Sequence, residues 1–184
     1  MKTAVRGALL AAASLLAAVP LLAGGSAHAG PAEPTTDATC VLNAHGLFAT
    51  AVGAGGTNLP VGDTLAMTGT VSCVDAAGAS AATGTFERTV TMPATECTGD
   101  EHGDTSTTTV NWADGAVSTF GFDTSDVVKV NGTASLAVTG AVTADSARFA
   151  GDTVNALGTS TGTGCGTPAG ETAVDSTLVL RLTH

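Results

Sequence analysis

The segment from residue 105 to residue 122, TSTTTVNWADGAVSTFGF, restricts the fold more than any other part of the chain. Two runs rich in β-branched and aromatic residues flank an Asp-Gly pair, and both of those residue types tolerate the positive φ angles of a tight hairpin turn. Large side chains recur at every second position, which is the period of a strand with one buried face. We therefore expect a β-hairpin with Trp112, Phe120 and Phe122 in the core.

The same alternation recurs along the rest of the chain. Residues 64–74 and 173–183 carry apolar side chains at every second position, and no segment after residue 29 has the period of a helix. A strand is expected at residues 85–92, ended by Pro93, and another at residues 147–157. About eight or nine strands with short turns predict an antiparallel β-sandwich with an immunoglobulin-like Greek key, and a closed β-barrel is the alternative.

The first 29 residues have the pattern of a cleaved secretory signal peptide. Lys2 and Arg6 form a positive start, residues 8–23 are apolar, and Ala-His-Ala at residues 27–29 is a small-x-small cleavage signal. Residues 30–39, GPAEPTTDAT, are expected to form a flexible tail, and residues 40–184 a single β domain. The protein is thus expected to be secreted, and no later segment approaches the length of a membrane span.

Four cysteines follow the expected cleavage point, at Cys40, Cys73, Cys97 and Cys165. An even number in an exported chain indicates two disulfides, and the absence of a C-x-x-C pair disfavours a zinc or redox motif. Cys40 opens one predicted strand and Cys73 closes the next, so antiparallel pairing would bring them face to face. This favours Cys40 with Cys73 and Cys97 with Cys165, among three connectivities that spacing alone leaves open.

The charge balance excludes some classes of partner. Without the first 29 residues, four basic residues stand against sixteen acidic ones, a net charge of −12. Such a surface repels phosphate backbones and anionic headgroups, so nucleic acid and lipid surfaces are not expected as partners. It suits a cationic partner or simply keeps the protein soluble outside the cell.

Few residues suggest chemistry. Carboxylates and an imidazole gather at Asp100, Glu101, His102 and Asp104, a weak metal candidate with no established ligand spacing, and a solvated acidic turn is the favoured explanation. Residues 158–162, GTSTG, match the G-x-S-x-G pattern, but we expect them in a loop without the helix that a nucleophile elbow requires. The later histidines show no spacing that suggests a triad. No catalytic residue and no cofactor is predicted.

A resemblance can be stated on longer stretches. TVNWADGAVSTFGF, the pattern V-x-G-x-A/L-x-V-T-G-x-V-T after it, and RFAGDTV resemble the T-x-x-W-x-D-G-x-x-S-T-F core and later F-x-G-D-x-V of small exported actinobacterial proteins of unknown function. The resemblance covers most of the chain after residue 29, including its four cysteines, and implies a secreted β-sandwich with disulfides but no activity. A weaker similarity, with different cysteine spacings, is to the apoproteins of enediyne chromoproteins, and it implies a carrier of a small apolar ligand.

These observations favour a secreted, non-catalytic module that binds another extracellular protein or has a structural role, for example as an adaptor in an extracellular assembly or toxin particle. Its loops, an edge strand or the segment 30–39 would make the contact. The alternatives are a carrier of a small apolar ligand and a secreted hydrolase. The oligomeric state is left open by the sequence.

Overall fold

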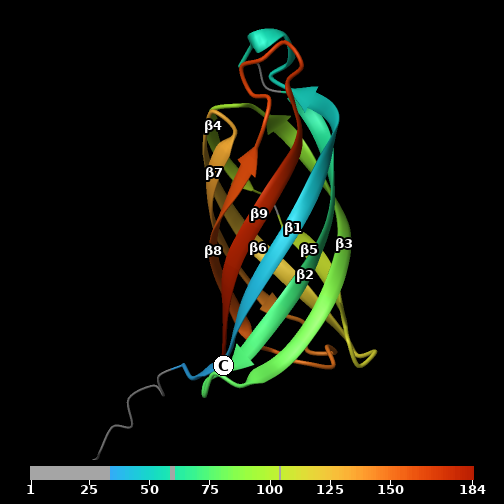
Figure 1. Cartoon of the computed structure of the whole chain (residues 1–184). Helices are drawn as coiled ribbons and strands as arrows, with labels where there is room; N and C mark the ends of the chain where they lie inside the picture. Colours follow the sequence, from blue (N-terminus) through green and yellow to red (C-terminus); the bar gives the residue numbers. More distant parts are fainter. Residues whose placement is uncertain (1–33, 59–60, 104) are drawn as a thin grey trace, which may run out of the picture. The chain divides into compact units, whose positions relative to one another are not determined.

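The computed structural model describes residues 34–58, 61–103 and 105–184, and the predicted signal peptide lies outside these ranges. The described chain forms nine strands and one short 3-10 helix (Figure 1). The strands are β1 (Thr36–Val52), β2 (Val61–Asp75), β3 (Ser80–Thr95), β4 (Gly99–Gly103), β5 (Ser106–Trp112), β6 (Val117–Val130), β7 (Thr133–Val142), β8 (Thr153–Gly162) and β9 (Glu171–Thr183). The 3-10 helix, η1, spans Ala54–Gly56.

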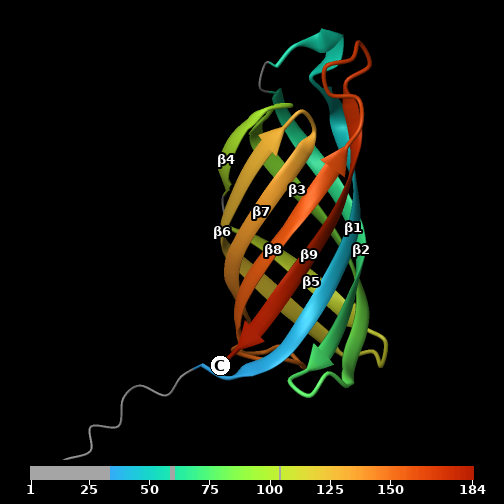
Figure 2. The same cartoon turned by 60° about the vertical axis from the view of Figure 1, so that its left-hand side comes forward.

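The strands form one antiparallel sheet that closes on itself. Strand β1 pairs with both β2 and β9, and β6 pairs with β7 on one side and with β5 and β4 on the other. The ring β1-β2-β3-β5-β6-β7-β8-β9 is thereby complete (Figure 2). The prediction of an immunoglobulin-like sandwich is wrong and its alternative, the closed barrel, is confirmed. Both architectures require the same alternation along each strand, so the pattern could not separate them.

Tight turns with left-handed residues connect the hairpins. Between β5 and β6, Trp112 N–H donates to the carbonyl of Ala116 at 2.8 Å, and Gly115 has φ 85°. This is a three-residue hairpin loop with glycine in its left-handed position. The β6–β7 turn consists of Asn131 (φ 49°) and Gly132 (φ 81°), whose positive φ values match the two-residue turn that Asn-Gly favours.

The large aromatic side chains of the core lie toward one end of the barrel, called the His184 end after the residue that follows β9. Trp112, Phe120 and Phe122 are 3%, 2% and 9% exposed there and belong to the continuous cluster of buried side chains inside the barrel. The indole N–H of Trp112 donates to Ser118 Oγ at 2.9 Å. Its ring meets Phe149 edge-on at 5.7 Å between centroids, so the buried donor is satisfied and the ring is packed.

Three predicted boundaries are corrected by the pairing. The tail does not extend to residue 39, because β1 begins at Thr36, and Thr36, Ala38 and Thr39 pair with β9 or β2. Strand β3 continues past Pro93 to Thr95. The ladder with β2 has a register shift between Met92 and Thr95, and proline, which has no N–H to donate, is tolerated at such an irregularity. Strand β8 begins at Thr153 rather than at residue 147, because Phe149 adopts φ 57° in a turn.

The two disulfides have the expected connectivity. Cys40 and Cys73 face each other in the β1–β2 ladder, and both are fully buried in the core. Cys97 is joined to Cys165 at the opposite end of the barrel, called the η1 end. The second disulfide links the β3–β4 connection to the β8–β9 connection, so it fastens together two loops that are far apart in the sequence.

Among the described residues, no helix has the length and apolar character required to cross a membrane.

Candidate functional site

The barrel wall is open between β3 and the β4–β5 side. Strand β3 pairs with β5 only where Gly84–Phe86 meet residues 110–112, whereas it pairs with β2 along almost its whole length. Among the described residues, strand β4 pairs with β6 alone. In the described part of the chain, residues 87–95 of β3 and residues 99–103 and 106–109 opposite them therefore have no ladder between them. We call these two facing strand edges the seam.

A side chain bridges the seam where the backbone ladder stops. Arg88 is the second residue beyond the last β3–β5 pair, and its Nη1 donates to Thr108 Oγ1 at 2.9 Å. Its guanidinium also lies 5.9 Å from the ring centroid of Phe122. Burial lowers the pKa of Arg88, and its Nε has no hydrogen-bond partner among the described residues. The long cationic side chain of Arg88 thus occupies the place where backbone pairing between β3 and β5 ends. Its Nε–H remains available as a hydrogen-bond donor.

A hollow of about 500 Å³ lies at the point where β3 and β5 separate. It is lined by Thr68, Gly69, Thr70, Thr85, Phe86, Glu87, Thr109 and Asn111. A second, smaller hollow on β1, β2 and β3 includes Glu87 and Arg88 in its wall. The outer surface is therefore concave along the start of the seam, and half of the residues that line the larger hollow are threonines.

The interior behind the seam is less completely buried than the core at the His184 end. Inward-facing apolar side chains in this half are of intermediate exposure, namely Phe48, Met67, Val90, Met92, Val127, Leu136 and Leu178. In contrast, Val154, Leu180 and Leu182 near the His184 end are at most 2% exposed. The two halves of one barrel thus differ: one is a filled core, and the other keeps apolar surface in contact with solvent.

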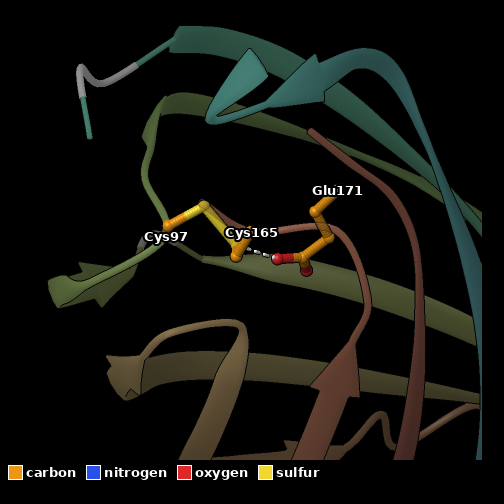
Figure 3. A group of neighbouring side chains, drawn as sticks. All are labelled: Cys97, Cys165 and Glu171. Atoms are coloured by element: carbon orange, nitrogen blue, oxygen red, sulfur yellow. Dashed lines mark hydrogen bonds between the residues drawn. A yellow bond between two sulfur atoms is a disulfide. The ribbon is translucent and has the colours of Figure 1, made fainter. Parts of the chain in front are cut away.

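The η1 end of the interior holds a buried ion pair next to the Cys97–Cys165 disulfide. Glu171 is fully buried, and its Oε1 accepts a hydrogen bond of 3.1 Å from Lys129 Nζ. Its Oε2 lies 2.5 Å from Cys165 Sγ (Figure 3). Burial raises the pKa of Glu171, while the Lys129 charge opposes that shift. Lys129 Nζ also lies 5.5 Å from the ring centroid of Phe48, so the cation has both a carboxylate and the face of an aromatic ring beside it.

The predicted acidic segment does not form a single ligand set. It contains β4, whose alternation places Asp100 and His102 on the outer face and Glu101 on the inner one. His102 Nδ1 lies 2.9 Å from Asp126 Oδ1 on β6, so the imidazole is engaged by its cross-strand neighbour. Burial, with a contribution from Glu96, raises the pKa of Glu101. Asp104 lies outside the described residues.

The G-x-S-x-G segment, residues 158–162, is the second half of β8 and not the loop that the sequence suggested. Ser160 faces the barrel interior and is 9% exposed. His45, His102 and His184 each form a hydrogen bond with an aspartate. None of these three forms one with a serine or threonine hydroxyl in the described part of the chain, so no triad is assembled from them there.

Comparison with known proteins does not supply a relative: no protein-family model, no curated protein and no solved structure matches this chain. The fold and site together define an antiparallel barrel whose ring of strands is complete, and in which β3 and β5 are paired over three residues each before they separate at the seam. The seam and the buried Lys129–Glu171 pair were not recognised in the sequence, because each depends on which strands become neighbours.

Proposed function

We propose that this protein is an exported, non-catalytic binding module that takes up an extended segment of a partner protein at the seam. The observation that carries the proposal is the pair of free strand edges in an otherwise continuous barrel. A strand edge without a partner presents a row of N–H and C=O groups, which an extended peptide can pair with. The predicted signal peptide and the two disulfides support export.

The seam offers both main-chain and side-chain recognition. Strand β3 already pairs with β2 through residues 87–92, so only every second one of them directs its backbone N–H and C=O toward the seam, and none of them is a proline. Val90 and Met92, on the inner side of the same edge, keep partly exposed apolar surface. Alternate side chains of an added strand would contact this apolar surface and the solvent in turn.

Charge selects the class of partner. Glu87 lies on β3 at the start of the seam, Glu96 follows its end, and Asp100 is exposed on β4. These carboxylates border both edges, and the predicted mature chain has a net charge of −12. A segment rich in lysine or arginine is the complementary ligand, and its association should weaken as salt rises because exposed charges are screened.

The test is capture of a partner from the culture medium, with variants that change the charge at the seam. Glu87→Lys/Asp100→Lys should abolish capture, whereas Asp175→Lys/Asp145→Lys makes the same charge change at exposed positions outside the seam and should retain most of it. Hydrogen exchange of the purified complex should show protection at residues 87–95. Absence of a stable companion, or protection confined to another surface, contradicts the proposal.

A second candidate function is carriage of a small apolar molecule. It is favoured by the partly exposed inward side chains of the η1 half, since eight-stranded barrels are wide enough to hold one small ligand. Native mass spectrometry of protein purified from its own source would show a bound mass that disappears under denaturing conditions. Met67→Trp, directed into that half, should displace the molecule without affecting partner capture at the outer edge. A native mass equal to that of the chain alone rejects the carrier.

A further inference from the structure

Three potential metal ligands converge at the His184 end of the barrel. Asp37 is on β1, Asp152 directly precedes β8, and His184 directly follows β9, beside the C label in Figure 1. The β1–β9 and β8–β9 ladders bring these three strand ends together. The backbone of His184 is further held by Thr35, through N–H to carbonyl hydrogen bonds of 2.9 and 3.2 Å in the two directions.

We propose that Asp37, Asp152 and His184 form a binding site for one Zn²⁺ ion. Their ligand atoms all lie within 4.8 Å of one another. His184 Nδ1 is 2.8 Å from Asp37 Oδ2 and 3.8 Å from Asp152 Oδ1. These two separations bracket the roughly 3.3 Å between ligand atoms of a tetrahedral ion with bonds of about 2 Å.

The buried carboxylate of Asp152 is the observation that supports a cation at this place. The residue is 2% exposed, and its Oδ2 has no hydrogen-bond partner among the described residues. A desolvated carboxylate without partners is costly. Burial and the negative charge of the nearby Asp37 raise the pKa of Asp152, and the charge of His184 partly opposes that shift. A divalent cation between the two carboxylates would compensate both charges and give the unpartnered oxygen a ligand.

The donor set selects the metal. One imidazole nitrogen and two carboxylate oxygens suit Zn²⁺, which binds both ligand types and takes four ligands, so a water molecule would complete the site. Ca²⁺ prefers six to eight oxygen ligands, which three side chains including an imidazole do not provide. The ion would join the ends of β1 and β9 to the start of β8 at the edge of the barrel.

The chain contains its own controls for this geometry. His45 Nδ1 lies 2.8 Å from Asp175, and His102 Nδ1 lies 2.9 Å from Asp126. Each of these pairs is an exposed imidazole against one carboxylate, like His184 with Asp37. Among the described residues, neither pair belongs to a cluster of three potential ligands, whereas the His184 pair does. The buried Asp152 carboxylate is therefore the feature that distinguishes the proposed site.

Titration calorimetry of the tag-free protein with ZnCl₂ tests the proposal. One Zn²⁺ should bind per chain, and Asp152→Asn and His184→Ala should each weaken binding at least about tenfold, since even residues outside the ligand shell change metal affinity by that factor. His45→Ala and His102→Ala should leave the affinity unchanged. Co²⁺ should give the visible absorption of a four-coordinate site in the parent protein and lose it in Asp152→Asn.

Several results would overturn the assignment. These are no heat with millimolar Zn²⁺, equal affinity in Asp152→Asn, loss of binding in His45→Ala, or tighter binding of Ca²⁺ than of Zn²⁺. Circular dichroism of every variant separates loss of a ligand from loss of the fold. If Asp152→Asn does not fold, Asp37→Asn serves in its place, because its side chain is one-third exposed and it too should lower the affinity.

Discussion

Lys129 Nζ lies 3.1 Å from Glu171 Oε1, and the pair spans the barrel interior between β6 and β9. These strands are not neighbours in the sheet, since β7 and β8 separate them. The side chain of Lys129 is 9% exposed and that of Glu171 is not exposed at all. Burial of two charges costs desolvation energy, and their mutual attraction offsets this cost only while both are present. Loss of one charge should therefore destabilise the fold more than loss of both.

Removal of one member of this pair should therefore be far worse than removal of both. Lys129→Met is expected to lower the free energy of unfolding by about 3 to 5 kcal/mol, because it leaves Glu171 buried without its cation. Lys129→Met/Glu171→Leu should recover most of that loss. Urea unfolding of the two single variants and the double variant gives the coupling energy. Additive effects of the single changes would show that the two charges do not interact.

Trp112→Ala should destabilise the protein by about 3 to 5 kcal/mol, because it creates a cavity in a filled core and removes the donor to Ser118. Val117→Ala on the adjoining strand is the control, since Val117 is 45% exposed and its truncation should change stability by about 0.5 kcal/mol or less. Midpoints of urea unfolding compare the two. An unchanged midpoint for Trp112→Ala would mean that the indole is not packed in solution.

Loss of the Cys97–Cys165 disulfide should loosen the seam selectively. Cys97→Ala/Cys165→Ala is expected to cost about 2 to 5 kcal/mol and to speed amide exchange in β4, which is short and pairs with β6 alone. Cys40→Ala/Cys73→Ala should also reduce stability, but without a local effect on β4, since this bridge lies within the β1–β2 ladder. Equal exchange in β4 for both double variants would contradict the prediction.

The His102–Asp126 contact should make part of the stability depend on pH. The hydrogen bond to Asp126 and that residue's negative charge raise the pKa of His102 above its ordinary value of 6.5. A raised pKa in the folded state means that the stabilisation is fully present below about pH 6.5 and is lost as pH rises through the folded pKa. Proton NMR titration should show this shift, and Asp126→Asn should reverse it.

The matched control for that titration is Asp175→Asn, which removes the partner of His45 on another face and should leave the His102 titration unchanged. Urea midpoints measured on both sides of the transition should differ less in Asp126→Asn than in the parent protein. A His102 titration that is the same with and without Asp126 would refute the prediction.

The strands were predictable because their alternation is a property of each segment alone. The β5–β6 hairpin and the β6–β7 turn follow from Asp-Gly and Asn-Gly pairs, whose backbone preferences act locally. Barrel closure was not determined by that signal, since it also depends on the pairing of β1 with β9 and of β3 with β5, which no short turn connects. One available signal was glycine at inward positions: a Cβ at Gly140 or Gly158 would collide with the backbone of the neighbouring strand, as at sites of close strand approach.

The candidate sites were less predictable than the fold. Asp37, Asp152 and His184 lie at the ends of three different strands, so only the β1–β9 and β8–β9 registers bring them together. The predicted acidic segment is the reverse case, because its residues are close in the sequence but are separated in the structure. Its residues are adjacent in sequence, but strand geometry directs neighbouring side chains to opposite faces, which separates Glu101 from Asp100 and His102.

The pairing of β1 with β9 has a consequence for when the protein can fold. This ladder joins residue 36 to residue 183, so the ring stays open until the last strand is available. Contacts between such distant segments form slowly, because the intervening chain must first be ordered. A nascent chain of this topology can therefore close its barrel only after residues 171–183 have been made.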